Sequence, residues 1–129
     1  MPDHEDVKKF YLKFDLGYDG PPRFLDGELL KLRLMFLEEE LNEFKSATEA
    51  KDIIKAFDAL LDLVYVCHGT AYLMGLPWDE GWSAIQSCNM AKVRAASPEQ
   101  SKRGSTHDVV KPEGWIGPED ELRRLLRKK

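Results

Sequence analysis

The feature that most constrains the fold is a run of five apolar residues spaced four, three, four and three positions apart. They are Leu30, Leu34, Leu37, Leu41 and Phe44. This spacing follows the 3.6-residue turn of an α-helix and places the five side chains along one stripe of its surface. The pattern predicts a helix over about residues 26–45, with Asp26 as its N-cap, that packs against other helices through this stripe.

Glycine and proline divide the rest of the chain into further helical segments, and no alternating strand pattern stands out among them. We predict these helices over about residues 3–16, 48–74, 78–95 and 118–127. The helices 26–45 and 48–74 should form an antiparallel hairpin, because only a few residues separate them. Residues 96–118, which are rich in Ser, Gly, Pro and Lys, are predicted to form a functional loop or flap. We therefore expect one all-α domain over residues 1–118, with residues 119–129 as its short closing helix.

Bulk properties favour a globular protein of the cytoplasm. The chain of 129 residues is 43% hydrophobic and 33% charged, which is ordinary for a folded domain. It shows no leader-like segment at Met1 and no apolar run near the roughly 18 residues that span a bilayer. Cys67 and Cys88 lack metal-ligand spacing, so we expect reduced thiols and no zinc.

Charge is distributed unevenly along the chain. Residues 1–88 carry a net charge of −8, and residues 89–129 carry +4. Acids, glycines and prolines interrupt the basic segment, and no ladder of aromatic residues accompanies it. The basic segment therefore suits a small polyphosphate better than a nucleic-acid polymer.

Acidic residues concentrate on two of the predicted helices. Four of them, Glu38, Glu39, Glu40 and Glu43, lie on the helix 26–45. None of the four has a Lys or Arg four residues later to offset its charge. Asp58 and Asp62 lie one turn apart on the next helix, in an otherwise apolar run. The plain interpretation of the glutamates is a solvated acidic surface, and that of Asp58 is an ion pair with Lys55. Asp62 differs, because a buried carboxylate requires a partner from elsewhere.

Antiparallel pairing of the two helices would bring these carboxylates together around a hard cation. Mg²⁺ fits the oxygen-only donor set, and Mn²⁺ should substitute for it. Iron is disfavoured, because helical carboxylate sites for iron use a Glu-x-x-His spacing that none of the three histidines provides. The face of the helix that carries Asp58 and Asp62 continues through Tyr65, Gly69 and Tyr72. The two rings and the gap at Gly69 could receive a flat ligand, or the rings could be ordinary core residues and Gly69 could serve close helix packing.

The ordered set of motifs resembles the MazG-like or phosphoribosyl-ATP pyrophosphohydrolase-like superfamily of all-α nucleoside triphosphate pyrophosphatases. Its signature is Glu-Glu-x-x-Glu followed by Glu-x-x-Asp. The segment Glu39-Glu40-Leu41-Asn42-Glu43 matches the first half. The second half is matched only at Asp62, since Ala59 stands in place of its glutamate and Asp58 lies one position earlier. Further matches, typical of phage-type members, are Asn89-Met90-Ala91-Lys92, Ser101-Lys102-Arg103-Gly104 and Asp108-Val109-Val110-Lys111-Pro112-Glu113-Gly114-Trp115.

The resemblance implies hydrolysis of an NTP or dNTP to the monophosphate and pyrophosphate, with a guanine preference suggested by phage-type members. The predicted metal ligands are Glu39, Glu40, Glu43, Asp58 and Asp62, and the predicted catalytic residues among them are Glu39 and Glu40. The predicted nucleotide contacts are Tyr65, Asn89, Lys92, Lys102, Arg103 and Lys111. The cytoplasm would be that of the host if the chain is phage-encoded.

Two alternatives stay open, namely phosphoribosyl-ATP hydrolysis and a non-catalytic helical protein whose acids hold an ion or a basic partner. In either case two helices bury too little apolar surface alone. The side chains that invite a second copy are Leu30, Leu34, Leu37, Phe57, Leu61 and Val64. We expect a four-helix-bundle core completed by homo-oligomerisation, as a homodimer or homotetramer, a nucleotide substrate, and no membrane or nucleic-acid polymer as partner.

Overall fold

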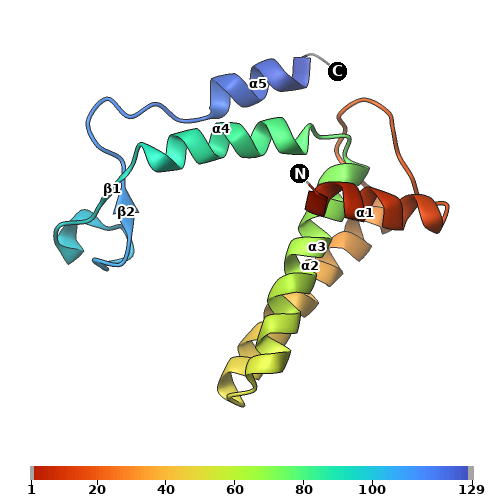
Figure 1. Cartoon of the computed structure of the whole chain (residues 1–129), viewed down its shortest axis with the longest axis horizontal. Coiled ribbons are helices and arrows are strands. Elements are labelled where there is room, and N and C mark those ends of the chain that lie inside the picture. Colours follow the sequence, from red (N-terminus) through yellow and green to blue (C-terminus); the bar gives the residue numbers. More distant parts are fainter. Residues whose placement is uncertain (1, 128–129) are drawn as a thin grey trace. The chain divides into compact units, whose positions relative to one another are not determined.

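The computed structural model describes residues 2–127 and shows a mostly helical chain (Figure 1). Its helices are α1 (Pro2–Lys13), α2 (Gly27–Glu49), α3 (Ile53–Leu73), α4 (Trp78–Met90) and α5 (Glu119–Arg127). The other elements are the 3-10 turn Pro98–Gln100 and the strands β1 (Val93–Arg94) and β2 (Val109–Val110). The prediction of an all-α fold is confirmed, with one very small sheet in addition.

Contacts within the chain define two compact units, Met1–Trp78 and Asp79–Lys129. The helices α1, α2 and α3 belong to the first unit, and α4, the two strands and α5 belong to the second. The prediction that residues 1–118 form one domain, closed by residues 119–129, stays a prediction.

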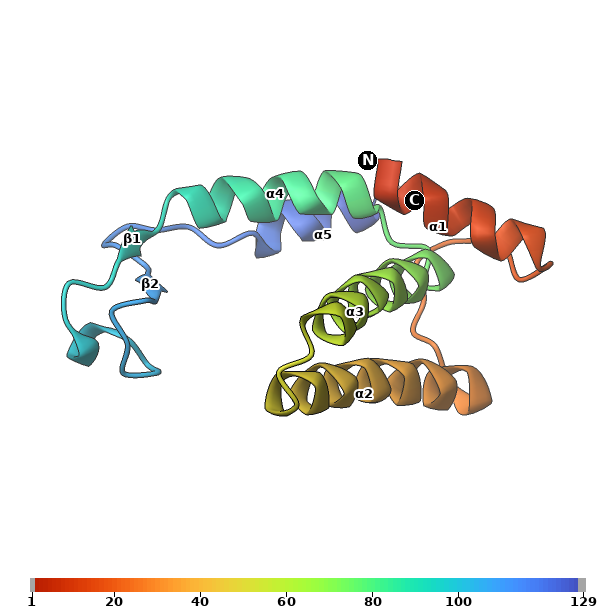
Figure 2. The ribbon, with the colours of Figure 1, turned by 60° about the horizontal axis from the view of Figure 1, so that its bottom comes forward.

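In the first unit, α2 and α3 form the expected antiparallel hairpin (Figures 1 and 2). Thr48, expected to begin the second helix of the pair, instead lies in the last turn of α2, where its hydroxyl donates to the carbonyl of Phe44 at 2.9 Å. Lys51 reverses the chain with a positive φ of 57°. The N-cap of α3 is Asp52, whose side chain accepts the backbone N–H of Lys55 at 3.1 Å.

The core of the first unit lies where α1 packs against α3. It is formed by Val7, Tyr11, Leu25 and Leu73. Arg33 of α2 is buried beside it, and its Nε donates to the hydroxyl of Thr70 at 3.1 Å. Its Nη1 donates to the hydroxyl of Tyr11, and its Nη2 donates to the carbonyl of Val66 at 3.0 Å. One guanidinium therefore ties α1 to both helices of the hairpin.

Gly69 is needed for this packing and does not leave a gap for a ligand. A Cβ at this position would lie 2.8 Å from Nη2 of Arg33 and closer still to the hydroxyl of Tyr11. Close helix packing is thus the correct interpretation of Gly69. The neighbouring His68 is buried and shares a hydrogen bond of 2.9 Å with the buried His4 through their Nδ1 atoms.

Both helices of the hairpin leave apolar side chains exposed in a single copy of the chain. On α3, the side chains of Phe57, Leu61 and Val64 are 62%, 55% and 52% exposed. On α2, Leu30 and Leu34 are 38% and 49% exposed, and Leu37 is half-buried. The stripe on α2 is therefore not fully covered by α3 within one chain.

Among the described residues, no single helix is long and apolar enough to cross a membrane. The helices α3 and α4, counted as one span across the break between them, are long and apolar enough. Length and composition alone are weak evidence for a membrane span, because the core helix of a soluble protein passes the same test.

In the second unit, α4 ends before the predicted Ala95 because the chain continues into β1. β1 pairs with β2 in the antiparallel sense, with Val93 opposite Val110 and Arg94 opposite Val109. The predicted flap over residues 96–118 therefore contains the 3-10 turn and β2. α5 runs back alongside α4 (Figures 1 and 2).

Candidate active site

Four carboxylates of the first unit come together across the α2–α3 hairpin. Glu40 and Asp62 each lie eleven residues from Lys51 at the turn, so they are level with each other in the antiparallel pair. Glu43 and Asp58 lie about one turn closer to Lys51 on their helices. The charges of Glu43, Asp62 and Asp58 all act on Glu40. Two acidic patches that are separate in sequence thus form one carboxylate cluster, consisting of Glu40, Glu43, Asp58 and Asp62.

Glu40 is the most perturbed member of the carboxylate cluster. Burial, the charges of Glu43 and Asp62, a side-chain hydrogen bond with Glu43 and the charge of Asp58 raise the pKa of Glu40 from 4.5 to about 7. The hydrogen bond with Glu43 requires a proton on one of the two carboxyls, and the buried Oε2 atom of Glu40 accepts no hydrogen bond from a donor among the described residues. Burial also raises the pKa of Asp62, and the charges of Asp58 and Glu43 add to this rise. A cation would offset the repulsion and give the buried oxygen a partner.

The donor set of the cluster fits a hard divalent cation. All four side chains offer carboxylate oxygens, which are the ligands that Mg²⁺ and Mn²⁺ prefer. Within residues 2–127, no three His, Cys, Asp or Glu side chains converge into a ready-made metal site. Full convergence is not required of a Mg²⁺ site, because this ion keeps several waters and often uses one or two carboxylates plus substrate phosphates.

Glu39 stands apart from the carboxylate cluster, although it is next to Glu40 on α2. It is exposed, and its charge is not among those that raise the pKa of Glu40. The structure therefore brings four of the five predicted metal ligands together and leaves Glu39 at the solvent side.

A groove of about 590 Å³ opens beside the cluster, near the turn of the hairpin. Glu43 and Asp58 line it, and the other lining residues are Asn42, Ser46, Ala47, Ala50, Asp52 and Lys55. Its volume lies in the range of small-molecule sites. Sequence reasoning missed this groove, because its polar residues look like ordinary helix surface until the two helices are paired.

Tyr65, the predicted nucleotide contact of the first unit, lies about one turn beyond Asp62 on α3. Its side chain is 38% exposed, and the ring of Phe10 packs edge-on against it with 5.5 Å between the centroids. Burial raises the pKa of Tyr65, with smaller contributions from Tyr11 and Asp6. A partly exposed aromatic ring near the cluster suits stacking with a nucleobase.

The remaining five predicted nucleotide contacts belong to the second unit. Asn89 is exposed in the last turn of α4, and Lys92 follows two residues after this helix ends. Lys102 and Arg103 are exposed on the loop between β1 and β2, and Lys111 directly follows β2. The structure therefore divides the predicted site residues between the two units.

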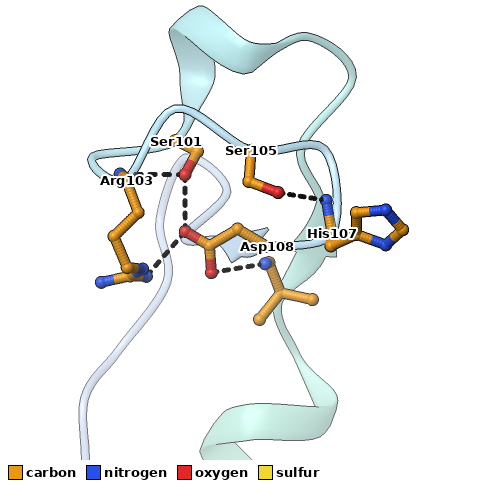
Figure 3. Close-up of polar contacts among 6 residues, drawn as sticks. Ser101, Arg103, Ser105, His107 and Asp108 are labelled. Carbon is orange, nitrogen blue, oxygen red and sulfur yellow. Dashed lines mark hydrogen bonds and ion pairs between the residues drawn. The ribbon is translucent and has the colours of Figure 1, made fainter. Parts of the chain in front are cut away.

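Arg103 is already engaged within its own loop (Figure 3). Its Nη2 donates to Oδ2 of Asp108 at 2.7 Å, and the hydroxyl of the buried Ser101 donates to the same oxygen at 2.7 Å. The backbone N–H of Arg103 in turn donates to the Ser101 hydroxyl at 3.0 Å. Hydrogen bonds from Arg103 and then Ser101 are the main causes that lower the pKa of Asp108 to about 2. Arg103 thus has a structural role in this loop that its sequence motif did not indicate.

Comparison with known protein families matches residues 7–89 to the family model described as phosphoribosyl-ATP pyrophosphohydrolase. The match covers nearly two thirds of the chain and includes the whole carboxylate cluster, with Glu39, Tyr65 and Asn89. It ends before Lys92, Lys102, Arg103 and Lys111. A search of curated proteins gives no match to this chain.

Proposed function

The chain belongs to the phosphoribosyl-ATP pyrophosphohydrolase family, and on this premise we propose that it hydrolyses nucleoside triphosphates to the monophosphate and pyrophosphate with Mg²⁺. Membership makes it a nucleotide pyrophosphohydrolase, an enzyme that cleaves the bond between the α- and β-phosphates. The observation that carries the proposal is the carboxylate cluster, in which burial and the neighbouring carboxylates raise the pKa of Glu40 to about 7.

Dependence on a divalent metal is general in this family, and we propose Mg²⁺ as the ion, with Mn²⁺ as a substitute. When bound, the ion would neutralise triphosphate oxygens and stabilise the charge on the departing pyrophosphate. Glu40, Glu43 and Asp62 would hold it. Asp58, at the edge of the groove, would supply a further oxygen.

Glu39 and Glu40 are the proposed catalytic carboxylates. Glu40 would act through the ion, because a bound cation would keep its carboxylate ionised. Where Glu40 serves as a metal ligand, the exposed Glu39 beside it is the carboxylate that would orient the water. The water oxygen forms a bond to the α-phosphorus as the bond to the pyrophosphate oxygen breaks.

We further propose that Tyr65 stacks with the base and that the second unit contacts the rest of the nucleotide. The residues proposed for the second role are Asn89, Lys92, Lys102, Arg103 and Lys111. A preference for dGTP or GTP follows from the resemblance to phage-type members. Nucleotides, rather than membranes or nucleic-acid polymers, are the proposed partners, and the cytoplasm is the proposed location.

The second candidate substrate is phosphoribosyl-ATP, which is favoured by the description of the matched family. Turnover of all eight NTPs and dNTPs, and of phosphoribosyl-ATP, should be measured with Mg²⁺ by the release of monophosphate and pyrophosphate. Highest kcat/KM on one or more ordinary triphosphates supports the proposal. Highest kcat/KM on phosphoribosyl-ATP would replace it with the second candidate.

Matched variants of acidic residues test whether the carboxylate cluster is the site. Asp62→Asn removes one charge from the cluster and should lower kcat/KM by at least about 100-fold, as for loss of a metal ligand or an electrostatic catalytic group. Glu38→Gln removes the same charge from an exposed position on α2 and should leave kcat/KM within about twofold of the wild type. Equal rates in the two variants would place the active site elsewhere.

We also propose that a second copy covers the exposed apolar side chains of the hairpin and completes a four-helix bundle. Leu30, Leu34, Phe57, Leu61 and Val64, all exposed in one chain, support this, with the half-buried Leu37. Sedimentation at micromolar concentration should give the mass of a homodimer or homotetramer. Leu61→Glu should shift the mass toward the monomer, whereas Leu126→Glu, at an exposed position of α5, should not. A monomeric wild-type mass would refute the assembly.

A further inference from the structure

Lys92, Lys111 and Trp115 converge in the second unit, beyond the residues that the family match covers. The Nζ atom of Lys92 lies 5.2 Å from the centroid of the Trp115 ring, and that of Lys111 lies 5.0 Å from it. Because both nitrogens lie near the same centroid, they are at most about 10 Å apart. Two cations and one aromatic ring, from the segment before β1 and the segment after β2, therefore form a compact group.

Lys92 and Lys111 lie at the same end of the small sheet. Val93, the first residue of β1, pairs with Val110, the last residue of β2, so Lys92 directly precedes this pair and Lys111 directly follows it. Like charges that are held near each other repel. Among the ion pairs of the described residues, none involves either lysine. An anion bound between the two lysines would offset their like charges.

Trp115 is fixed in position, so the two lysines share a rigid support. Its indole Nε1 donates to the carbonyl of Cys88 at 2.8 Å, and its backbone N–H donates to the carbonyl of Pro112 at 3.1 Å. Gly114 makes this turn with a φ of 78°, which side chains rarely permit. Contact with the ring orders both ammonium groups without neutralising them.

We propose that Lys92 and Lys111, ordered by Trp115, form a binding site for a diphosphate group. Each ammonium can donate charge-assisted hydrogen bonds to one of the two phosphoryl groups, whereas an isolated phosphate has only one such group to offer. The site uses no residue of the carboxylate cluster. The inference deepens the proposed function, on which its biological meaning rests, because nucleoside triphosphates contain a diphosphate and their hydrolysis releases one.

Titration calorimetry of the full chain with inorganic pyrophosphate in EDTA tests the site, because EDTA removes the cations on which the carboxylate cluster would depend. Lys92→Met and Lys111→Met should each weaken pyrophosphate binding by about tenfold or more, through loss of a charge-assisted hydrogen bond. Arg127→Met, which removes an exposed charge from the same unit, should change the affinity by less than about twofold.

Variants of the ring separate an ordering role from charge alone. Trp115→Phe keeps an aromatic face and should bind pyrophosphate within about threefold of the wild type, whereas Trp115→Leu should weaken binding several-fold more. Circular dichroism of each variant checks that it is folded. The lysine variants, which leave the turn intact, keep the test valid if Trp115→Leu does not fold.

The choice of probe identifies the source of the diphosphate. Inorganic phosphate should bind more weakly than pyrophosphate. Equal losses for pyrophosphate and a non-hydrolysable NTP in the lysine variants assign the site to the substrate, and a loss for pyrophosphate alone assigns it to the product.

Either of two results would overturn the inference. One is that the wild type does not bind pyrophosphate, and the other is that both lysine variants bind it with the affinity of the wild type. Hydrolysis measured in parallel keeps the two proposals distinct. Pyrophosphate binding without turnover of any nucleotide refutes the proposed function and leaves the diphosphate site standing. Conversely, turnover of a nucleotide together with unweakened pyrophosphate binding in the lysine variants supports the proposed function and refutes the diphosphate site.

Discussion

The raised pKa of Glu40 leads to a specific pH dependence of metal binding. Burial and the charges of Glu43, Asp62 and Asp58 move this pKa from 4.5 to about 7. A carboxylate must lose its proton to bind a metal ion, so protons and Mg²⁺ compete for Glu40. Affinity for Mg²⁺ should therefore rise with pH and level off above about pH 8.

The size of the effect follows from the fraction of Glu40 that is ionised. With a pKa of about 7, this fraction is about one tenth at pH 6 and about nine tenths at pH 8. Apparent Mg²⁺ affinity should fall by roughly tenfold from pH 8 to pH 6, which is about 1.4 kcal/mol. A glutamate with the ordinary pKa of 4.5 would be almost fully ionised at both values and would produce almost no change.

Calorimetric titration with Mg²⁺ at pH 6, 7 and 8 measures this dependence. Glu40→Gln should bind Mg²⁺ more weakly and lose most of the pH dependence, whereas Glu38→Gln should keep it. A flat profile in the wild type, or the same slope in Glu40→Gln, would refute the reasoning.

The same shift acts on the stability of the metal-free chain with a defined sign. Between about pH 4.5 and pH 7 the folded chain retains a proton on Glu40 that the unfolded chain releases. In EDTA, the contribution of Glu40 to stability should therefore decrease as the pH rises through this window and then stay constant. The difference in melting temperature between wild type and Glu40→Gln isolates this contribution.

Three further predictions concern the metal, the core and the loop of the second unit. Saturating Mg²⁺ should raise the melting temperature and EDTA should reverse the rise, because a ligand that binds only the folded chain stabilises it; an unchanged melting temperature would contradict the metal site. Gly69→Ala should lower the free energy of unfolding, measured in urea, by about 1–2 kcal/mol through overpacking. Gly81→Ala should raise it by about 0.5–1 kcal/mol, because alanine is favoured over glycine in a helix and the new Cβ would have its nearest neighbour at 3.6 Å. Asp108→Asn should speed trypsin cleavage after Arg103, since the loop loses its charged acceptor, while Glu99→Gln should leave the rate unchanged; equal rates would show that the network does not hold the loop.

The hairpin and its acidic residues were predictable because both depend on helical periodicity. The spacing of Leu30 to Phe44 fixed the helix, and the short connection fixed its antiparallel partner. With both helices placed, Glu40 and Asp62 become level through their equal distance from the turn. What periodicity could not supply was the degree of burial of each carboxylate, and this is what separates Glu40 from the exposed Glu39.

The features that sequence reasoning missed depend on contacts between distant residues. Thr48 and Asp52 are both favoured N-cap residues, so local chemistry alone does not decide which of them begins α3. Arg33 looks like a surface residue on its helix until Tyr11 and Thr70, from two other segments, are found to accept its hydrogen bonds. The two-residue strands are too short for any alternating pattern, so the pairing of β1 with β2, which brings Lys92 and Lys111 to the same end of the sheet, was equally hidden.

The departure from the family signature at Ala59 has a physical basis in the hairpin. Ala59 has no exposed surface and lies level with Glu43 of α2, so a glutamate here would have to fit between the packed helices. Asp58, one residue earlier, is exposed and lines the groove. Its charge contributes to the raised pKa of both Glu40 and Asp62. The fourth carboxylate thus stands at the edge of the groove rather than inside the helix interface. A cluster that is open on this side favours a metal ion whose coordination is completed by water and substrate phosphates, as Mg²⁺ requires.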